Sequence, residues 1–301
     1  MYTLESVKQG VQNPRLVLQE LNRLYYRRFR QWSYNRDGID IFERDWDTLL
    51  LLDACRYDLF ERVSDLPGTL EPVTSRGSAT REFIRGNFHG REFHDTVYVT
   101  ASPMLSRHRD TVHTQFHDVI NVWQEEGWDD KYRTVLPQVV TQATLQAREQ
   151  YPNKRLLVHY LQPHYPFIGP TGEEHFDLQR LDFQWEDFLQ NDMSDEVIWD
   201  AYEENLELVL PDVETLLHEL QGKTVVTSDH GNMVGGRSFP VPIKEYGHPS
   251  GMYTDELVTV PWLTYQNGAR LTIESERSAD SERDESAGDL AKERLQELGY
   301  V

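Results

Sequence analysis

Three short apolar runs, each followed directly by polar residues, constrain the fold of this chain more than any other feature of its sequence. They are DTLLLLD at 47–53, RLLVHYL at 155–161 and KTVVTSDH at 223–230. Runs of this length and composition are typical of parallel strands that are buried on both faces. Because parallel strands end at a common edge of their sheet, we expect the polar residues that follow these runs to gather there.

Helical patterns alternate with these strands. We expect helices over 136–149 and 196–220, a helix beginning at Asp58, and a further strand over 96–101. The helix over 196–220 is amphipathic, with its apolar positions at Ile198, Tyr202, Leu206, Val209, Leu210, Val213, Leu216 and Leu217. This alternation predicts an α/β fold with a doubly wound, mostly parallel sheet flanked by helices.

The two ends of the chain differ from its centre. Residues 4–33 follow a helical pattern, residues 274–287 (ESERSADSERDESA) are charged without a period, and residues 289–298 suit a short helix. We therefore expect an N-terminal helical extension over 1–45, a catalytic domain over 46–270, and a charged linker with a short C-terminal helix over 271–301.

The charge balance restricts the partners. The chain has 51 acidic residues against 30 Lys and Arg, for a formal net charge of −21. This balance argues against nucleic acid as a partner, and an anionic substrate would need a local metal or a cluster of arginines. An acidic surface with few lysines favours a salt-adapted, haloarchaeal-type organism, although an ordinary acidic protein has the same signature.

Cysteine content and hydropathy bear on location. Cys55 is the single cysteine, so an internal disulfide is excluded, and we expect it to be a small buried residue. The N-terminal residues lack an apolar run of the length that a signal peptide or a membrane span needs. We therefore expect a cytoplasmic protein without a transmembrane segment; the oligomeric state stays open.

A candidate metal site follows from the strand ends. Asp53 ends the first apolar run, and Asp229 and His230 end the last. Two carboxylates and an imidazole form a mixed donor set that suits Zn²⁺ or Mn²⁺ better than Ca²⁺. Each residue also has a structural interpretation, in which the aspartate caps the next helix and the histidine bonds locally within a turn.

These motifs resemble the alkaline phosphatase superfamily, in particular its sulfatase-like branch. The resemblance rests on LLLDACRYD at 50–58, HYLQPHYPF at 159–167 and TSDHG at 227–231, and it extends over about residues 46–266. It implies an alkaline-phosphatase-like fold and a divalent metal (Zn, Mn, Mg or Ca) held by Asp53, Asp229 and His230. It also implies a nucleophile between the first two motifs.

The position of that nucleophile follows less clearly from the resemblance. Family members carry it in a Cys-x-Pro-Ser or Thr-x-Pro-Ser string before a helix, and Ser75-Arg76-Gly77-Ser78 matches this string best. Ser75 is therefore the favoured nucleophile, with Ser78 and Thr80 as alternatives and Ser78 also suited to cap the helix. Arg76 or Arg81 would stabilise the developing negative charge.

Histidines near the strand ends are further candidates. The resemblance suggests that His164 and His248 bind the anion or protonate the leaving group, whereas His159 suits a buried structural role. A second metal would need more ligands from the middle of the chain. Glu203, Glu204 and Asn205 are expected on the solvent face of a helix instead, so we favour one metal.

Together these features predict a metal-dependent hydrolase or phosphoryl-type transferase that acts on phosphate or sulfate esters. The chain lacks the Cys/Ser-x-Pro-x-Arg string that sulfatases convert to an aldehyde, which favours phosphate esters. The expected substrate is a small molecule or a glycan or lipid-head-group ester. The alternative is a catalytically degenerate relative that binds an anion or partner without turnover; a cofactor-independent mutase fits the chain length less well.

Overall fold

The structure is a computed structural model that describes residues 14–28, 32–124, 127–177, 193–277 and 287–300. Its elements, in chain order, are α2 (Pro14–Tyr26), the 3₁₀ helix η1 (Ile41–Glu43), β1 (Thr48–Leu52), α3 (Tyr57–Val63), β2 (Thr69–Thr74), α4 (Thr80–Phe88), β3 (Glu92–Thr100), α5 (Met104–Val112), β4 (Gln115–Asn121), α6 (Pro137–Gln150), β5 (Arg155–Tyr160), α7 (Pro170–His175), α9 (Asp195–Glu219), β6 (Gly222–Thr227), β7 (Met233–Arg237), β8 (Lys244–Gly247), α10 (Asp255–Val258), β9 (Thr259–Asn267) and α11 (Ala287–Glu297).

A mixed sheet forms the centre of the fold. Within the described residues it has seven strands in the order β2-β9-β6-β1-β5-β3-β4, and β7 and β8 form a separate hairpin. Strands β6, β1, β5, β3 and β4 pair in parallel, whereas β9 runs antiparallel to both β6 and β2. The predicted mostly parallel, doubly wound sheet is confirmed, with an antiparallel edge that the sequence pattern did not indicate.

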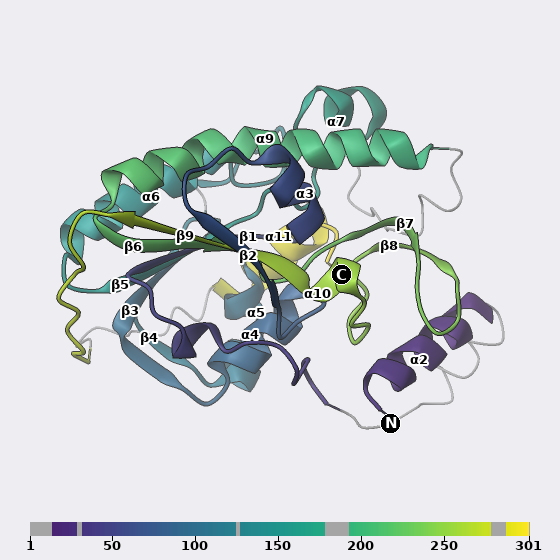
Figure 1. The fold of residues 1–301 in the computed structure, drawn as a ribbon, viewed down its shortest axis with the longest axis horizontal. Coiled ribbons are helices and arrows are strands. Elements are labelled where there is room, and N and C mark those ends of the chain that lie inside the picture. The colour runs from purple at the N-terminus through teal and green to yellow at the C-terminus, as the bar shows by residue number, and fades with distance from the viewer. Residues whose placement is uncertain (1–13, 29–31, 125–126, 178–192, 278–286, 301) are drawn as a thin grey trace.

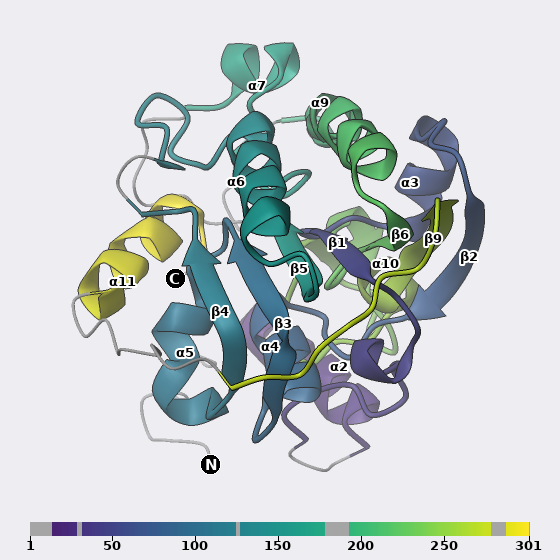
Figure 2. The same cartoon turned by 90° about the vertical axis from the view of Figure 1, so that its left-hand side faces the viewer.

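Helices cover both faces of this sheet (Figures 1 and 2). Helices α6 and α9 lie over one face, and α4 and α5 lie over the other. Strand β1 shows why both layers form: Leu50 and Leu52 pack into one core cluster and Leu49 and Leu51 into the other, all fully buried. Because side chains alternate along a strand, a run of four leucines supplies both faces at once.

The ends of the chain fit the expectations in part. Helix α2 begins at Pro14, so residues 4–13 of the predicted helix lie outside the described residues. The prediction that it extends to residue 33 is wrong, because the helix ends at Tyr26 and Arg28 adopts a positive φ of 49°. Helix α11 confirms the short C-terminal helix, and most of the charged stretch before it lies outside the described residues.

Long apolar helices do not occur in the described part of the chain. No helix there is both long enough and apolar enough to cross a membrane.

Candidate active site

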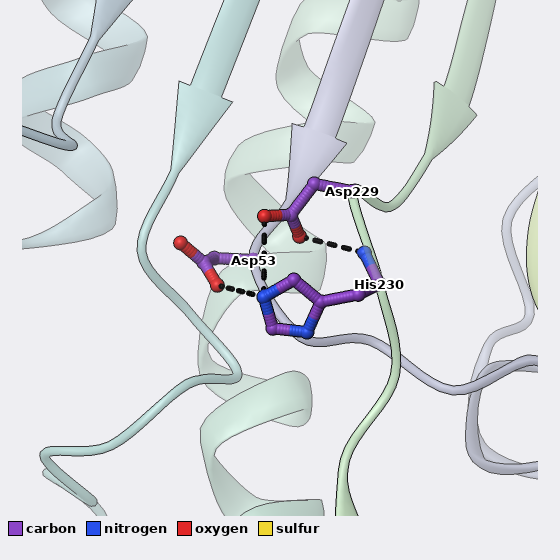
Figure 3. Close-up of side chains that lie close together, drawn as sticks. All are labelled: Asp53, Asp229 and His230. Atoms are coloured by element: carbon purple, nitrogen blue, oxygen red, sulfur yellow. Dashed lines mark hydrogen bonds and ion pairs between the residues drawn. The ribbon is translucent and has the colours of Figure 1, made fainter. Parts of the chain in front are cut away.

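The strand register places the predicted metal ligands side by side. Leu51 of β1 pairs with Thr227 of β6, so Asp53 and Asp229 each follow that pair by two residues. Both strands end at the same edge, and the two carboxylates reach the same level beyond it. Figure 3 shows Asp53, Asp229 and His230 pointing toward one another from these strand ends. All three side chains are fully buried.

The spacing of these groups suits a single cation. Ligand atoms of all three residues lie within 4.8 Å of one another. The Nε2 atom of His230 lies 3.3 Å from Oδ2 of Asp229 and 3.6 Å from Oδ1 of Asp53. Two ligand atoms that are each about 2.0–2.2 Å from a tetrahedral zinc ion lie roughly 3.3–3.6 Å apart. The residues therefore fit such an ion.

The backbone around the site presets the ligand atoms. Nδ1 of His230 lies 2.8 Å from the carbonyl oxygen of Gly231, and because a carbonyl oxygen only accepts, Nδ1 carries the proton. The lone pair of Nε2 then faces the carboxylates, as in metal-binding histidines. Oδ1 of Asp229 accepts from the backbone N–H groups of Ala54 and His230, at 3.1 and 2.9 Å.

Two carboxylate oxygens in the site lack a donor. Within the described residues, Oδ1 of Asp53 and Oδ2 of Asp229 are buried without a hydrogen-bond partner. A buried acceptor without a donor typically costs about 1–3 kcal/mol. A divalent cation between these oxygens would satisfy both, which is the strongest structural indication that the cluster binds a metal.

Thr80 contributes a hydroxyl to the same cluster. It is the first residue of α4, and its Oγ1 lies 3.2 Å from Nε2 of His230 and 3.5 Å from Oδ2 of Asp53. A hydroxyl in this position is within reach of a metal bound by the cluster. Thr80 also lines a cavity, and its side chain is fully buried beneath it, 3.5 Å from the hydroxyl of Tyr300. Thr80 was only an alternative to Ser75 in the sequence analysis.

The two serines that the sequence favoured make other contacts. The hydroxyl of Ser75 donates to the backbone carbonyl of Asp229 and accepts from the N–H of Gly77. The hydroxyl of Ser78 bonds to Glu82 of α4 at 3.0 Å and accepts from the N–H of Gly251 at 2.9 Å. Ser75 thus reaches the backbone of Asp229 but not the proposed ligand atoms, and Ser78 bonds to Glu82 and Gly251 instead.

The two predicted arginines point in different directions. Arg76 donates to a carboxylate oxygen of Asp40 and to the carbonyl of Gly86, at 2.9 and 2.7 Å, and so holds the N-terminal segment against α4. Arg81 is exposed and lines the cavity next to Thr80. Of the two, Arg81 alone is placed to meet a substrate.

His164, which is buried, and His248, which is half-buried, form a pair beside the proposed metal ligands. Their Nε2 atoms lie 2.8 Å apart, and the ring of His248 lies 4.5 Å from the ring of His230. Nδ1 of His164 donates to the carbonyl of Tyr165, so its Nε2 accepts a hydrogen bond from Nε2–H of His248. Burial lowers the pKa of both histidines, for His248 together with the neighbouring His230 and His164.

His159 makes a tighter contact with the site than we expected. Its Nε2 lies 3.4 Å from Oδ2 of Asp53, and its Nδ1 lies 2.8 Å from the hydroxyl of Tyr98. Burial lowers the pKa of His159, but the hydrogen bond and the charge of Asp53 outweigh burial and raise it. His159 is thus a buried histidine that also orients a metal ligand.

Sequence analysis missed two residues of the site. The hydroxyl of Tyr300 donates to Oδ2 of Asp53 at 2.6 Å, and its ring stacks on His164 with centroids 4.5 Å apart. Asn205 of α9 is fully buried, so its predicted place on the solvent face is wrong. Its amide holds the carbonyls of Pro163, His164 and Pro166 at 3.0–3.4 Å. The sequence signal for Asn205 was its position among the apolar residues of the amphipathic helix, on the face that we expected to be buried.

Comparisons with family models and with curated proteins found no match. Solved structures of similar fold include lipooligosaccharide phosphoethanolamine transferase A from Neisseria meningitidis, with 12% identity over 73% of this chain and 47% of that chain and a TM-score of 0.48. The chain thus spans about half the length of that transferase. An alkaline phosphatase superfamily protein from Vibrio parahaemolyticus has 11% identity over 93% and 75% of the two chains and a TM-score of 0.42.

A third similar structure is the phosphoglycerol transferase GacH from Streptococcus pyogenes, in complex with sn-glycerol-1-phosphate. It has 11% identity over 93% of this chain and 91% of that chain and a TM-score of 0.38. Since the identities and TM-scores of these structures are low, we rest the function on the geometry of the site.

Proposed function

We propose that this chain is a metal-dependent hydrolase or phosphoryl-type transferase that acts on phosphate esters, with Thr80 as its nucleophile. Asp53, Asp229 and His230 would hold one divalent cation. The observation that carries the proposal is the position of the Thr80 hydroxyl, 3.2 Å from Nε2 of His230. The hydroxyl of Ser75, by contrast, bonds to the backbone of Asp229 and not to a ligand atom, and that of Ser78 bonds to Glu82.

The residues around Thr80 divide the chemistry among them. A bound divalent metal would polarise the ester oxygens and lower the pKa of a hydroxyl next to it. The Thr80 oxygen would form a bond to phosphorus as the ester alcohol leaves, and water or a second alcohol would then release the group from Thr80. His248 lines the cavity next to Thr80, but its Nε2–H donates to His164 and burial lowers its pKa, so the proton that Thr80 releases would reach the leaving alcohol through water.

Phosphate esters suit this site better than sulfate esters. The residue at the proposed nucleophile position is a threonine. A threonine cannot be converted to the aldehyde that the sulfatases of the resembled superfamily use. A threonine hydroxyl is, however, a suitable acceptor for a phosphoryl group.

Trapping of the covalent intermediate tests the proposal. Protein stripped of metal with EDTA is reloaded with Zn²⁺ or Mn²⁺ and assayed with nitrophenyl phosphate, bis-nitrophenyl phosphate and nitrophenyl sulfate. We expect metal-dependent turnover of a phosphate ester. Acid quenching followed by peptide mass spectrometry should show one added phosphoryl group on the peptide that contains Thr80.

Matched hydroxyl variants separate the candidates. Thr80→Ala should abolish both turnover and the phosphopeptide, while Thr80→Ser, which keeps the hydroxyl, should retain both in part. Ser75→Ala serves as the control and should still form the phosphopeptide at Thr80. A phosphoryl group found on Ser75 or Ser78 in the wild type would overturn the assignment.

A second candidate function is binding of an anion or partner without turnover. The contact of Tyr300 with Asp53 favours it, because the phenol occupies an oxygen of a metal ligand. Tight metal binding without turnover of any of the three esters, in both the wild type and Tyr300→Phe, would support this candidate over the enzyme.

A further inference from the structure

A cavity of about 430 Å³ opens next to the proposed nucleophile. It is lined by Thr80 and Arg81 of α4, by Arg107 and His108 of α5, and by Tyr300 near the C-terminus. Because Thr80 lies on its wall, a substrate whose ester is held at Thr80 would place the rest of the molecule in this cavity. The residues that line the cavity therefore determine which chemical groups that part of the substrate can have.

The cavity is basic although the chain is strongly acidic. Arg81 and Arg107 are both exposed, and no hydrogen bond or carboxylate partner of either guanidinium is found within the described residues. The carboxylate on the cavity wall, Glu245, is bound by Arg15 and Gln19, each at 2.9 Å. Two arginines without carboxylate partners in one cavity, in a chain of net charge −21, indicate a site for an anion.

His108 reports the same positive potential. Burial, and then the charges of Arg81, Arg107 and Arg85, together lower the pKa of His108 to about 4. Three guanidinium groups therefore act on one half-buried imidazole at the cavity wall. Within the described residues, no hydrogen bond or ion pair joins His108 to the proposed metal ligands. The pKa of His108 therefore probes the charge in the cavity independently of the metal site.

We propose that this cavity binds a second phosphate group of the substrate, carried by the same molecule as the ester that reacts at Thr80. The planar guanidinium groups of Arg81 and Arg107 match the oxygens of a phosphate in a bidentate arrangement. The inference rests on the proposed function for its placement relative to the reacting ester. The binding of phosphate in the cavity does not need turnover.

Phosphate binding to the metal-free protein tests the cavity by itself. Inorganic phosphate is titrated into EDTA-stripped protein by calorimetry at fixed ionic strength, and the pKa of His108 is followed by NMR with and without phosphate. We expect binding, and we expect phosphate to raise the pKa of His108 because it offsets the charge of the arginines. The double variant Arg81→Gln/Arg107→Gln should bind phosphate about tenfold more weakly or worse.

Two variants control for charge and folding. Arg109→Gln removes the same charge from an exposed position on α5 that does not line the cavity, so it should leave phosphate affinity unchanged within about a factor of two. Arg81→Lys/Arg107→Lys should restore part of the affinity. The proposal is overturned if Arg109→Gln weakens binding as much as the double variant, or if phosphate leaves the pKa of His108 unchanged.

A pair of substrates then connects the cavity to catalysis. Thymidine 5′-(nitrophenyl phosphate) is compared with its 3′-phosphorylated derivative, which has the same reacting group and an added phosphate. The wild type should favour the phosphorylated compound in kcat/KM, and the double variant should lose that preference. Phosphate binding without turnover would refute the proposed function and leave the cavity site standing, whereas turnover without the preference would refute the second phosphate.

Discussion

Asp229→Asn should make the metal-free protein more stable and should remove most of the stabilisation by metal. In the metal-free protein, Oδ2 of Asp229 is a buried carboxylate oxygen without a donor, 3.3 Å from Nε2 of His230. An amide NH₂ at that position can donate to Nε2, while the remaining oxygen still accepts from the N–H groups of Ala54 and His230. We therefore expect the variant to exceed the wild type in metal-free unfolding free energy by about 1–3 kcal/mol.

Addition of metal should remove most or all of this advantage. A metal at a hundredfold excess over its dissociation constant adds about 2.7 kcal/mol to the free energy of unfolding of the wild type, or a Tm shift of roughly 5 °C. The variant has lost an anionic ligand and should gain little. Thermal unfolding with EDTA and with Zn²⁺ or Mn²⁺ measures both effects.

An exposed aspartate provides the control. Asp65→Asn, on the loop after α3, should follow the wild type in both conditions. Equal stabilisation of wild type and Asp229→Asn by metal would refute the ligand assignment. A metal-free variant that is less stable than the wild type would refute our account of the buried oxygen.

Three further changes probe the surroundings of the site. Asn205→Ala removes the amide that holds the carbonyls of Pro163, His164 and Pro166, and we expect a loss of about 2–4 kcal/mol in urea unfolding. The pKa of His108 in the folded protein is about 4, below its ordinary 6.5, so the unfolded chain takes up a proton first as pH drops. The free energy of unfolding should therefore fall between about pH 6.5 and pH 4, and His108→Gln should flatten this dependence in unfolding measured against pH. Tyr300→Phe removes the donor to Asp53 and should tighten Mn²⁺ binding by up to about tenfold in calorimetry; unchanged affinity would mean that the phenol and the metal share the carboxylate.

The cluster of Asp53, Asp229 and His230 could be predicted from sequence because its residues directly follow buried strands. A continuous apolar run fixes its strand in the middle of the sheet, and the parallel pairing of Leu51 with Thr227 then fixes the relation of Asp53 to Asp229. The same reasoning could not find β2 and β9 at the antiparallel edge. Strand β2 has mostly exposed or half-buried residues and contains Pro72, so it lacks the apolar signal of a central strand.

The hydroxyl that lies nearest the cluster could not be chosen from sequence because its position depends on where α4 begins. Three residues with a hydroxyl lie within the six-residue segment 75–80, which ends at the first residue of that helix: Ser75, Ser78 and Thr80. Which hydroxyl reaches Asp53 is decided by the path of the loop. Tyr300 is harder still to predict, since it lies 247 residues from Asp53 and follows a helix that has no motif.

Polar residues that look catalytic in the sequence can instead hold the catalytic groups in place. Ser75 binds the backbone of Asp229, and Ser78 ties the start of α4 to the loop at Gly251. The loop that carries His164 is likewise held by Asn205. The strand ends provide ligands in fixed register, whereas the nucleophile and the histidine pair come from loops and a helix start that need such buried bonds. Replacement of these serines should therefore affect catalysis through the position of neighbouring groups, and the phosphopeptide at Thr80 distinguishes that indirect effect from the loss of a nucleophile.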